Sequence, residues 1–249
     1  MITQQTLIVG ANSEIAKALA CEILKQQNCG LLLLSRHFDE QWQHERTPEQ
    51  LQRIKLISVE DYSESSIEHS IDKINSNSQL PITRVFICNG LLHNKTVKPE
   101  KRLEDFDAGA FHQVMSANVL TPMLWLQKLT SILTGEVKCK VVLLSARVGS
   151  ISDNRLGGWY SYRASKAALN MMVKTASIEL ARRAKNIKLI LFHPGTTDSP
   201  LSKPFQANVP QNKLFRPEFV ATQLLSILDK QEVDGVASYL DWQGESINW

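Results

Sequence analysis

The sequence predicts an α/β fold in which a doubly wound parallel sheet carries helices on both faces. Short apolar runs alternate regularly with segments long enough to form helices. The run Leu31-Leu32-Leu33-Leu34 lacks polar alternation, which is typical of a strand covered on both faces. The 249 residues contain no internal repeat, low-complexity stretch or linker, so we expect one domain over 1–249.

The elements follow in order along the chain. The expected strands are the six apolar runs 6–9, 31–34, 54–59, 85–88, 141–144 and 189–192. A helical pattern follows the first run, and the later expected helices are 64–78, 111–133, 162–184 and 217–230. The polar segment 37–53 fits either an irregular loop or a short helix. Right-handed crossovers would bring the carboxyl ends of the strands to one edge, where such sheets bind ligands.

Composition argues against several classes of partner. The net charge of +3 is small and no long run of like charges occurs, so neither nucleic acid nor an anionic membrane is expected to bind. No apolar run approaches the roughly 18 residues of a membrane span, and no leader pattern precedes the first strand. The four cysteines show no metal-binding spacing, and we expect reduced thiols in a soluble, cytoplasmic protein. They are Cys21, Cys29, Cys88 and Cys139.

Two expected helices are apolar over more than one stripe. Helices 111–133 and 162–184 both carry apolar residues around much of their circumference. A surface helix needs only one buried stripe, so a second buried side is indicated. A homodimer or homotetramer interface would explain it, although a central helix under a long loop would do so too.

The turn after the first strand, Gly10-Ala11-Asn12-Ser13-Glu14-Ile15-Ala16, leads into a helix. Glycine-rich turns of this kind hold a dinucleotide pyrophosphate on backbone amides at the helix N-terminus. Only Gly10 is glycine here. Glu14 stands where a phosphate would approach, although the helix dipole would equally favour it as an internal first-turn charge.

Arg36 follows the second strand, where dinucleotide folds contact the adenosine ribose. An arginine there pairs with a 2′-phosphate, so Arg36 favours NADP(H) over NAD(H), the alternative being a solvated surface arginine. Asp61, after the third strand, either borders the adenine or caps the next helix.

The remaining strand ends carry small and hydroxyl-bearing residues. The fourth run leads into Cys88-Asn89-Gly90, and Ser145 follows the fifth. The sixth leads into the rigid turn Pro194-Gly195-Thr196-Thr197. The segment 196–215 beyond it has apolar anchors (Leu201, Phe205, Leu214), and we expect it to be a substrate lid.

Tyr162 and Lys166 stand one helical turn apart at the start of helix 162–184, so both lie on one face. A neighbouring ammonium lowers the pKa of a phenol towards the working range, which would make Tyr162 a proton donor. Tyr160 lies on another face. The spacing alone also fits an ordinary surface helix.

Together these residues resemble a classical short-chain dehydrogenase/reductase, with a Rossmann fold over the whole chain. The matching motifs are Gly10–Ala16, Cys88-Asn89-Gly90, Asn118, Tyr162-Arg163-Ala164-Ser165-Lys166 and Pro194-Gly195. The runs 147–151, 194–198 and 241–249 resemble the C-factor and sniffer-type carbonyl reductase branch.

The resemblance implies a role for each matching residue. Tyr162 would exchange a proton with the substrate oxygen, Lys166 would hold the nicotinamide ribose and lower the tyrosine pKa, and Asn118 would anchor a water. The implied cofactor contacts, besides Tyr162 and Lys166, are Gly10, Asn12, Ser13, Ile15, Arg36, Asp61, Asn89, Gly90, Pro194, Gly195 and Thr197.

Three departures from the family pattern stand out. Glu14 and Ala16 replace the second and third loop glycines, and Cys88 replaces an asparagine. The family's catalytic serine falls on Ala146, with Ser145 one residue early. Either an irregular strand end lets Ser145 serve, or the substrate oxygen has one donor fewer, and losing one donor costs about 10²–10³ in rate.

Two functions follow as hypotheses. The first is an NADP(H)-dependent oxidoreductase that interconverts a small-molecule carbonyl and alcohol. The second, motivated by Glu14, Ala146 and the likeness to C-factor, is a dinucleotide-binding signalling or sensor protein with weak or no turnover. A fold that has lost its cofactor is a third, plainer option.

Overall fold

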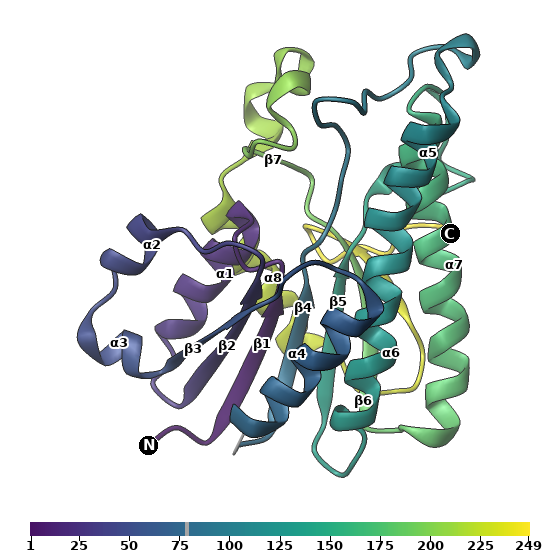
Figure 1. The fold of residues 1–249 in the computed structure, drawn as a ribbon. Coiled ribbons are helices and arrows are strands. Elements are labelled where there is room, and N and C mark those ends of the chain that lie inside the picture. The colour runs from purple at the N-terminus through teal and green to yellow at the C-terminus, as the bar shows by residue number, and fades with distance from the viewer. Residues whose placement is uncertain (78–79) are drawn as a thin grey trace.

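A parallel sheet of seven strands forms the centre of the protein in the computed structural model, which describes residues 1–77 and 80–249 (Figure 1). The strand order is β3-β2-β1-β4-β5-β6-β9, which is the doubly wound arrangement that the sequence predicts. The strands are β1 (Gln4–Val9), β2 (Cys29–Ser35), β3 (Ile54–Ser58), β4 (Ile82–Ile87), β5 (Cys139–Leu144), β6 (Ile187–His193) and β9 (Ser238–Asp241).

Helices cover both faces of this sheet. The alternation of side chains along β1 shows the division, because Leu7 and Val9 belong to one apolar cluster and Ile8 to the other. The first cluster is covered by α4 (Glu64–Asn77), α6 (Thr121–Leu133) and α7 (Tyr160–Arg183), and the second by α1 (Glu14–Leu24) and α8 (Pro217–Lys230).

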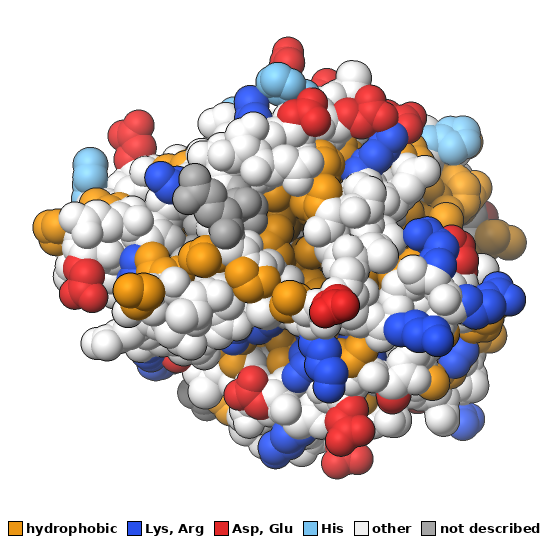
Figure 2. Space-filling model, turned by 90° about the horizontal axis from the view of Figure 1, so that it is seen from below, with side chains coloured by type: hydrophobic (Ala, Val, Ile, Leu, Met, Phe, Trp, Pro, Cys, Tyr) orange, Lys and Arg blue, Asp and Glu red, His pale blue; other side chains and the backbone are white. Residues whose placement is uncertain are grey.

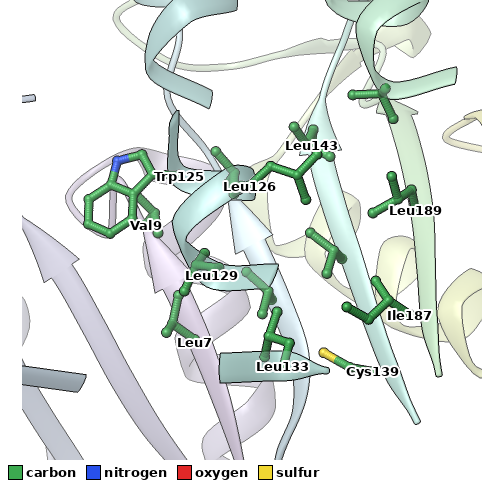
Figure 3. Close-up of a cluster of buried hydrophobic side chains, with 14 of the residues drawn as sticks. Leu7, Val9, Trp125, Leu126, Leu129, Leu133, Cys139, Leu143, Ile187 and Leu189 are labelled. Atoms are coloured by element: carbon green, nitrogen blue, oxygen red, sulfur yellow. The ribbon is translucent and has the colours of Figure 1, made fainter. Parts of the chain in front are cut away.

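The packing of α6 shows how the first face is held together. Trp125, Leu126, Leu129 and Leu133 recur at helical spacing, and all point towards strands β1, β5 and β6 (Figure 3). Trp125 and Leu129 have no exposed surface. Burying one such side chain stabilises a fold by roughly 1.5–3 kcal/mol, so this face fixes α6 firmly against the sheet.

The segment expected as one helix over 111–133 is interrupted. It consists of α5 (Ala108–Met115), a π-helical turn η2 (Ser116–Leu120) and α6. Apolar periodicity continues through all three pieces, so the pattern does not reveal the wider turn. Such turns insert a residue into the hydrogen-bond ladder and occur often at functional sites.

Two further segments differ from or refine the expectations. The polar stretch 37–53 forms two short helices, α2 (Glu40–His44) and α3 (Pro48–Gln52), capped by the side chains of Asp39 and Thr47. Strand β9 was not expected, because four residues make too short a run to stand out. The expected helix 64–78 is α4, and residue 78 lies outside the described residues.

The segment after β6 is tethered at both ends. Strand β7 (Thr196–Thr197) pairs with β8 (Leu214–Phe215), and two 3-10 turns, η4 (Lys203–Asn208) and η5 (Gln211–Lys213), lie between them. In Figure 1 this segment rises beyond the carboxyl ends of the strands.

Positive and negative side chains alternate with uncharged surface on the face drawn in Figure 2. No large patch of side chains with one sign of charge covers that face, which agrees with the small net charge. Within 1–77 and 80–249, no helix is both long and apolar enough to cross a membrane. The same residues contain no cluster of three His, Cys, Asp or Glu side chains suited to a metal ion.

Candidate active site

Tyr162 and Lys166 lie in the first two turns of α7, both buried at the carboxyl-end edge of the sheet. The Lys166 Nζ atom is 5.7 Å from the centroid of the Tyr162 ring. It donates a hydrogen bond of 2.9 Å to the carbonyl oxygen of Leu144, at the end of β5. The spacing noted in the sequence therefore places a phenol beside an amine, at the end of a central strand.

Burial governs the acidity of both groups. Loss of hydration lowers the pKa of Lys166 to about 8 and raises the pKa of Tyr162 above its ordinary value. The expected lowering of the tyrosine pKa by Lys166 is therefore wrong for this structure. The cost of burying a phenolate is the main cause of the raised tyrosine pKa, and the nearby Tyr239 raises it further.

Asn118 sits in the π-helical turn and has no exposed surface. Its Oδ1 accepts from the Leu91 N–H at 2.6 Å, and its Nδ2 donates to the Leu91 carbonyl at 2.8 Å and to Ser165 Oγ at 3.0 Å. The Ser165 hydroxyl in turn donates to the carbonyl of Tyr162 at 2.8 Å. Asn118 thus joins the loop after β4 to the helix that carries Tyr162.

Gly90 shows how closely these pieces meet. A methyl group placed on Gly90 would lie 3.7 Å from Asn118 Oδ1 and 3.9 Å from Lys166 Nζ. Three segments that are distant in the sequence (the β4 end, the π turn and α7) therefore converge on one spot. This is the convergence that the parallel topology predicts.

Ser145 has its hydroxyl engaged on α7. Ser145 Oγ donates to Asn170 Oδ1 at 2.6 Å, two turns beyond Tyr162, and the side chain is buried. Ala146 has an extended backbone (φ −153°, ψ 144°), so its side chain points to the opposite side from that of Ser145. The Tyr239 hydroxyl donates a hydrogen bond of 2.6 Å to the carbonyl oxygen of Ala146.

A cleft of about 770 Å³ opens beside this group, between the ends of β1, β2 and β4. Six of the predicted cofactor contacts line it: Gly10, Asn12, Ser13, Arg36, Asn89 and Gly90. The other predicted cofactor contacts do not line it: Ile15, Asp61, Tyr162, Lys166, Pro194, Gly195 and Thr197. Ile15 packs against the apolar cluster of α1, and Asp61 borders a neighbouring hollow of about 760 Å³ that shares Arg36.

The backbone at Gly10 lies close to the end of β4, where a side chain would have little room. Gly10 has φ +74°, and a Cβ there would lie 3.2 Å from the carbonyl carbon of Cys88. Ser13 caps α1 by accepting from the Ala16 N–H at 3.3 Å. The helix N-terminus therefore faces the cleft on a tight turn, although Glu14 and Ala16 replace two glycines.

Two buried polar atoms fit a nicotinamide dinucleotide. Asn89 Oδ1 and Thr197 Oγ1 are both buried without a hydrogen-bond partner among the described residues. Buried polar atoms normally have partners, so the unpaired Asn89 Oδ1 at the cleft indicates a ligand, whereas Thr197 lies outside the cleft lining. Both residues were predicted cofactor contacts, one on the ribose side and one on the nicotinamide side.

The charges near the cleft are partly balanced. Glu14 forms an ion pair of 2.9 Å with Lys17, which also contacts Asp39 at 3.0 Å, so its charge towards a phosphate is offset. The Arg36 guanidinium stacks 4.8 Å from the centroid of the Tyr62 ring. Hydrogen bonds from Ser63, and to a smaller extent the charge of Arg36, lower the pKa of Asp61. An acid therefore lies near Arg36 in space, which the sequence neighbours of Arg36 do not show.

Aromatic side chains continue from Tyr162 to the segment after β6. The Trp159 ring is 6.1 Å from that of Tyr162 and 5.0 Å from that of Phe205, and the His93 ring is 5.7 Å from Phe205. Sequence reasoning named Phe205 as an anchor but missed Trp159 and His93. The Gly157-Gly158 pair before Trp159 was the available signal for an unusual turn there.

The family model for the short chain dehydrogenases matches residues 4–210. The chain belongs to this family. It is 28% identical over 143 residues to a 1-hydroxy-2-glutathionyl-2-methyl-3-butene dehydrogenase of Rhodococcus, a match covering 57% of this chain and 60% of the relative. It is 29% identical over 147 residues to the C-signal protein of Myxococcus xanthus, covering 59% and 83%. The alignment thus spans less than two thirds of the Rhodococcus relative's length.

Solved structures extend the likeness to the whole chain. The carbonyl reductase Sniffer of D. melanogaster superposes with a TM-score of 0.82 at 17% identity, over 99% of this chain and 100% of that one. An NADPH-bound carbonyl reductase from chicken fatty liver gives 0.83 at 16% identity, over 100% of both. These neighbours confirm the fold, and the C-signal match supports the predicted branch of the family.

Proposed function

We propose that the protein is an NADP(H)-dependent oxidoreductase that transfers hydride between the nicotinamide and a carbonyl or alcohol substrate, with Tyr162 as acid and base. The observation that carries this proposal is the meeting of Tyr162, Lys166 and Asn118 at Gly90, on the edge of a cleft that the unpaired Asn89 Oδ1 also lines. Membership of the short chain dehydrogenases supports the reaction class, and the NADPH-bound chicken enzyme supports the cofactor.

Each residue of the site has a role in the reaction that follows from its surroundings. Bound cofactor would supply or accept the hydride, held by Lys166, Asn89 and Thr197. The Tyr162 hydroxyl donates its proton to the substrate oxygen as negative charge develops there. Because burial raises its pKa, Tyr162 carries that proton throughout the neutral range, which suits reduction. The Lys166 ammonium, 5.7 Å from the ring, then favours the phenolate that remains.

Tyr162→Phe tests the chemical step. The variant keeps the aromatic packing but has no proton to donate, so reduction of a panel of aldehydes and ketones with NADPH should be lost. NADPH affinity measured by calorimetry should change little. A Tyr162→Phe protein that reduces the panel as fast as the wild type would rule out the proposed role.

The preference for NADP(H) rests on Arg36, whose guanidinium borders both hollows. A bidentate contact with a 2′-phosphate is the strong form of such an ion pair. Arg36→Ala should therefore weaken NADPH binding by about tenfold or more while NADH binding changes little. Lys73→Ala, a cation on the same outer hollow, is the matched control. Equal losses for both cofactors would contradict the assignment.

A second function is favoured by Ser145 and Ala146. The Ser145 hydroxyl is bound to Asn170, and the family's serine position carries no hydroxyl. A dinucleotide-binding sensor or signalling protein with weak turnover would have this arrangement, and the C-signal relative agrees with it. Tight NADPH binding without turnover on any carbonyl would favour this function over the first.

We further infer residues 196–215 to be the substrate lid of a single domain, and the location to be cytoplasmic. The lid is supported by the Phe205 ring packed against Trp159, next to Tyr162. The location is supported by the four free thiols, three of them buried. A small carbonyl compound and a second copy of the chain are the partners we infer.

A further inference from the structure

A carboxylate from a distant loop caps the helix that carries Tyr162. Glu100 is buried, with 4% of its surface exposed. Both of its carboxylate oxygens accept from the Ser161 N–H at 3.2 Å, and one also accepts from the Ser161 hydroxyl. Trp159, at the N-cap position of α7, makes no side-chain capping bond. Glu100 therefore supplies the capping acceptor, and its negative charge suits a helix N-terminus.

The same residue holds the backbone of Trp159 in an unusual conformation. Trp159 has φ 53° and ψ 43°, and it is the one residue other than glycine with positive φ within the described chain. The Trp159 N–H donates to the Glu100 carbonyl at 2.6 Å. Glycines at 157 and 158 also have positive φ and lead the chain into this turn. A bulky residue stays in the left-handed region only where its surroundings enforce it.

This conformation decides where the indole lies. The Trp159 ring meets the Tyr162 ring edge-on at 6.1 Å and the Phe205 ring at 5.0 Å. The His93 ring lies 5.7 Å from the Phe205 ring, and its Nε2 lies 3.2 Å from the carbonyl oxygens of Pro200 and Leu201. Trp159 is half-buried. Trp159 therefore keeps some exposed surface while its ring lies between those of Tyr162 and Phe205.

We propose that Trp159 is the specificity-determining wall of the substrate site, and that Glu100 is the positioning residue that holds it against Tyr162. The inference rests on the proposed carbonyl reduction. A fixed indole beside the acid offers a flat apolar face, so a carbonyl with a planar, conjugated substituent packs well. A puckered aliphatic ring of the same size makes fewer contacts there. The substrate class is therefore an aryl or conjugated carbonyl compound.

Two ketones of similar size test whether Trp159 determines the substrate specificity. Phenyl methyl ketone and cyclohexyl methyl ketone differ mainly in flatness, and kcat/KM with NADPH is measured for each. The wild type should prefer the phenyl compound by about tenfold, and Trp159→Ala should reduce that preference to about twofold or less. Trp159→Phe should keep most of the preference. Tyr160→Ala, at the neighbouring exposed position, should leave it unchanged.

The outcomes separate this inference from the proposed function. A wild type that binds NADPH but reduces neither ketone would overturn the proposed function, and the inference with it. A wild type that reduces both, with the same preference in Trp159→Ala, would overturn the inference alone. NADPH affinity measured by calorimetry should be equal in all four proteins.

The role of Glu100 has its own variants. Glu100→Ala should lose the phenyl preference as Trp159→Ala does, and its kcat should fall by about tenfold because the first turn of α7 loosens. Glu100→Gln keeps an acceptor for Ser161, so it should retain most of the phenyl preference and most of kcat. Glu104→Gln, an exposed glutamate near Glu100, is the control. A Glu100→Ala protein with a lower melting temperature but unchanged preference and kcat would show a purely structural role.

If Glu100→Ala does not fold, Ser161→Ala gives the same test, because it removes the hydroxyl that binds the carboxylate. It should weaken the phenyl preference partially, between the wild type and Trp159→Ala. An unchanged preference in Ser161→Ala would overturn the positioning role.

Discussion

At the scale of single residues, the titration of Lys166, rather than that of Tyr162, should determine how the rate of reduction depends on pH. Burial raises the pKa of Tyr162, so its proton remains in place well above neutral pH. Burial lowers the pKa of Lys166 to about 8, so its ammonium is present below that value and is lost as the pH rises through it. The neutral amine no longer stabilises the phenolate left after proton donation.

The pH dependence of reduction follows from this difference. At saturating NADPH, kcat/KM for a carbonyl substrate should be level at lower pH and fall above about pH 8. Rates measured from about pH 6 to about pH 10 check this. Lys166→Arg, which keeps its charge throughout, should remove the fall even if its rate is lower. A wild-type profile that stays level to the end of the range would contradict the pKa of Lys166.

Ala146 gives a second prediction at this scale. Its side chain points away from the Ser145–Asn170 contact, so Ala146→Ser places a hydroxyl where the family has its serine. An added donor to the substrate oxygen should raise kcat, by about tenfold or more. Steady-state kinetics on one aldehyde measures the gain.

Ser145→Ala is the matched variant for Ala146→Ser. It removes the hydrogen bond to Asn170 and should lower stability by about 1 kcal/mol with little effect on kcat. The reverse result, with Ser145→Ala inactive and Ala146→Ser no faster than the wild type, would show that Ser145 itself serves the substrate.

Spacing predicted that Tyr162 and Lys166 share one face, because a one-turn spacing on a helix is local information, and Asn118 was predicted from the resemblance to the family. Neither the spacing nor the resemblance identified Glu100 or Trp159. The Glu100–Ser161 contact joins positions 61 residues apart, and no local pattern marks a capping group supplied from that distance. The direction of the Tyr162 pKa was missed for the same reason, since burial is a property of the folded chain.

At the scale of elements, the turn between β1 and α1 depends on Gly10. Its φ of +74° disfavours any side chain, and a Cβ would lie 3.2 Å from Cys88 at the end of β4. Gly10→Ala should therefore destabilise the protein by about 1–3 kcal/mol and weaken NADPH binding, since the turn borders the cleft. Urea unfolding and calorimetry measure the two effects.

Gly135→Ala is the matched control for that variant. No atom lies within 4 Å of a Cβ built there, and Gly135 is not among the glycines with positive φ. It should change stability by less than about 1 kcal/mol, and it should leave NADPH binding intact. Equal losses in the two variants would mean that the Gly10 conformation is not what holds the turn.

The elements show where the apolar pattern carries information and where it fails. Buried runs located β1, β2 and β4–β6, because strands covered on both faces are apolar throughout. The π-helical turn of Asn118 was hidden, since one extra residue per turn barely disturbs the apolar spacing over 111–133. The bounds of helix α7 (Tyr160–Arg183), in contrast, lie close to the expected 162–184.

At the scale of the whole molecule, the sheet order explains why scattered residues form one site. Strands β1, β4 and β5 are neighbours, so Gly10, Gly90 and the Leu144 carbonyl share one edge with Lys166. The parallel topology could be predicted from alternating elements, and with it this convergence. The pairing of β7 with β8, which tethers both ends of the segment 196–215, could not, because each of these strands is only two residues long.

The outer face of α7 leads to the last prediction, which concerns assembly. Met171, Met172 and Ile178 are exposed on this helix, and Leu120 is exposed on the π-helical turn that contacts it. Met171 and Ile178 are two turns apart and share one face. Because α7 was expected to bury a second side, we predict a homodimer or homotetramer in which this face meets a second copy.

Replacing apolar interface residues with charges tests the assembly. Met171→Glu together with Ile178→Glu should give monomers by analytical ultracentrifugation, because unpaired carboxylates would be buried between copies. Leu51→Glu, at a comparably exposed apolar position on α3, should leave the assembly unchanged. A wild type that sediments as a monomer at all concentrations would contradict the prediction. Since α7 also carries Tyr162 and Lys166, the double variant would show in addition whether turnover depends on assembly.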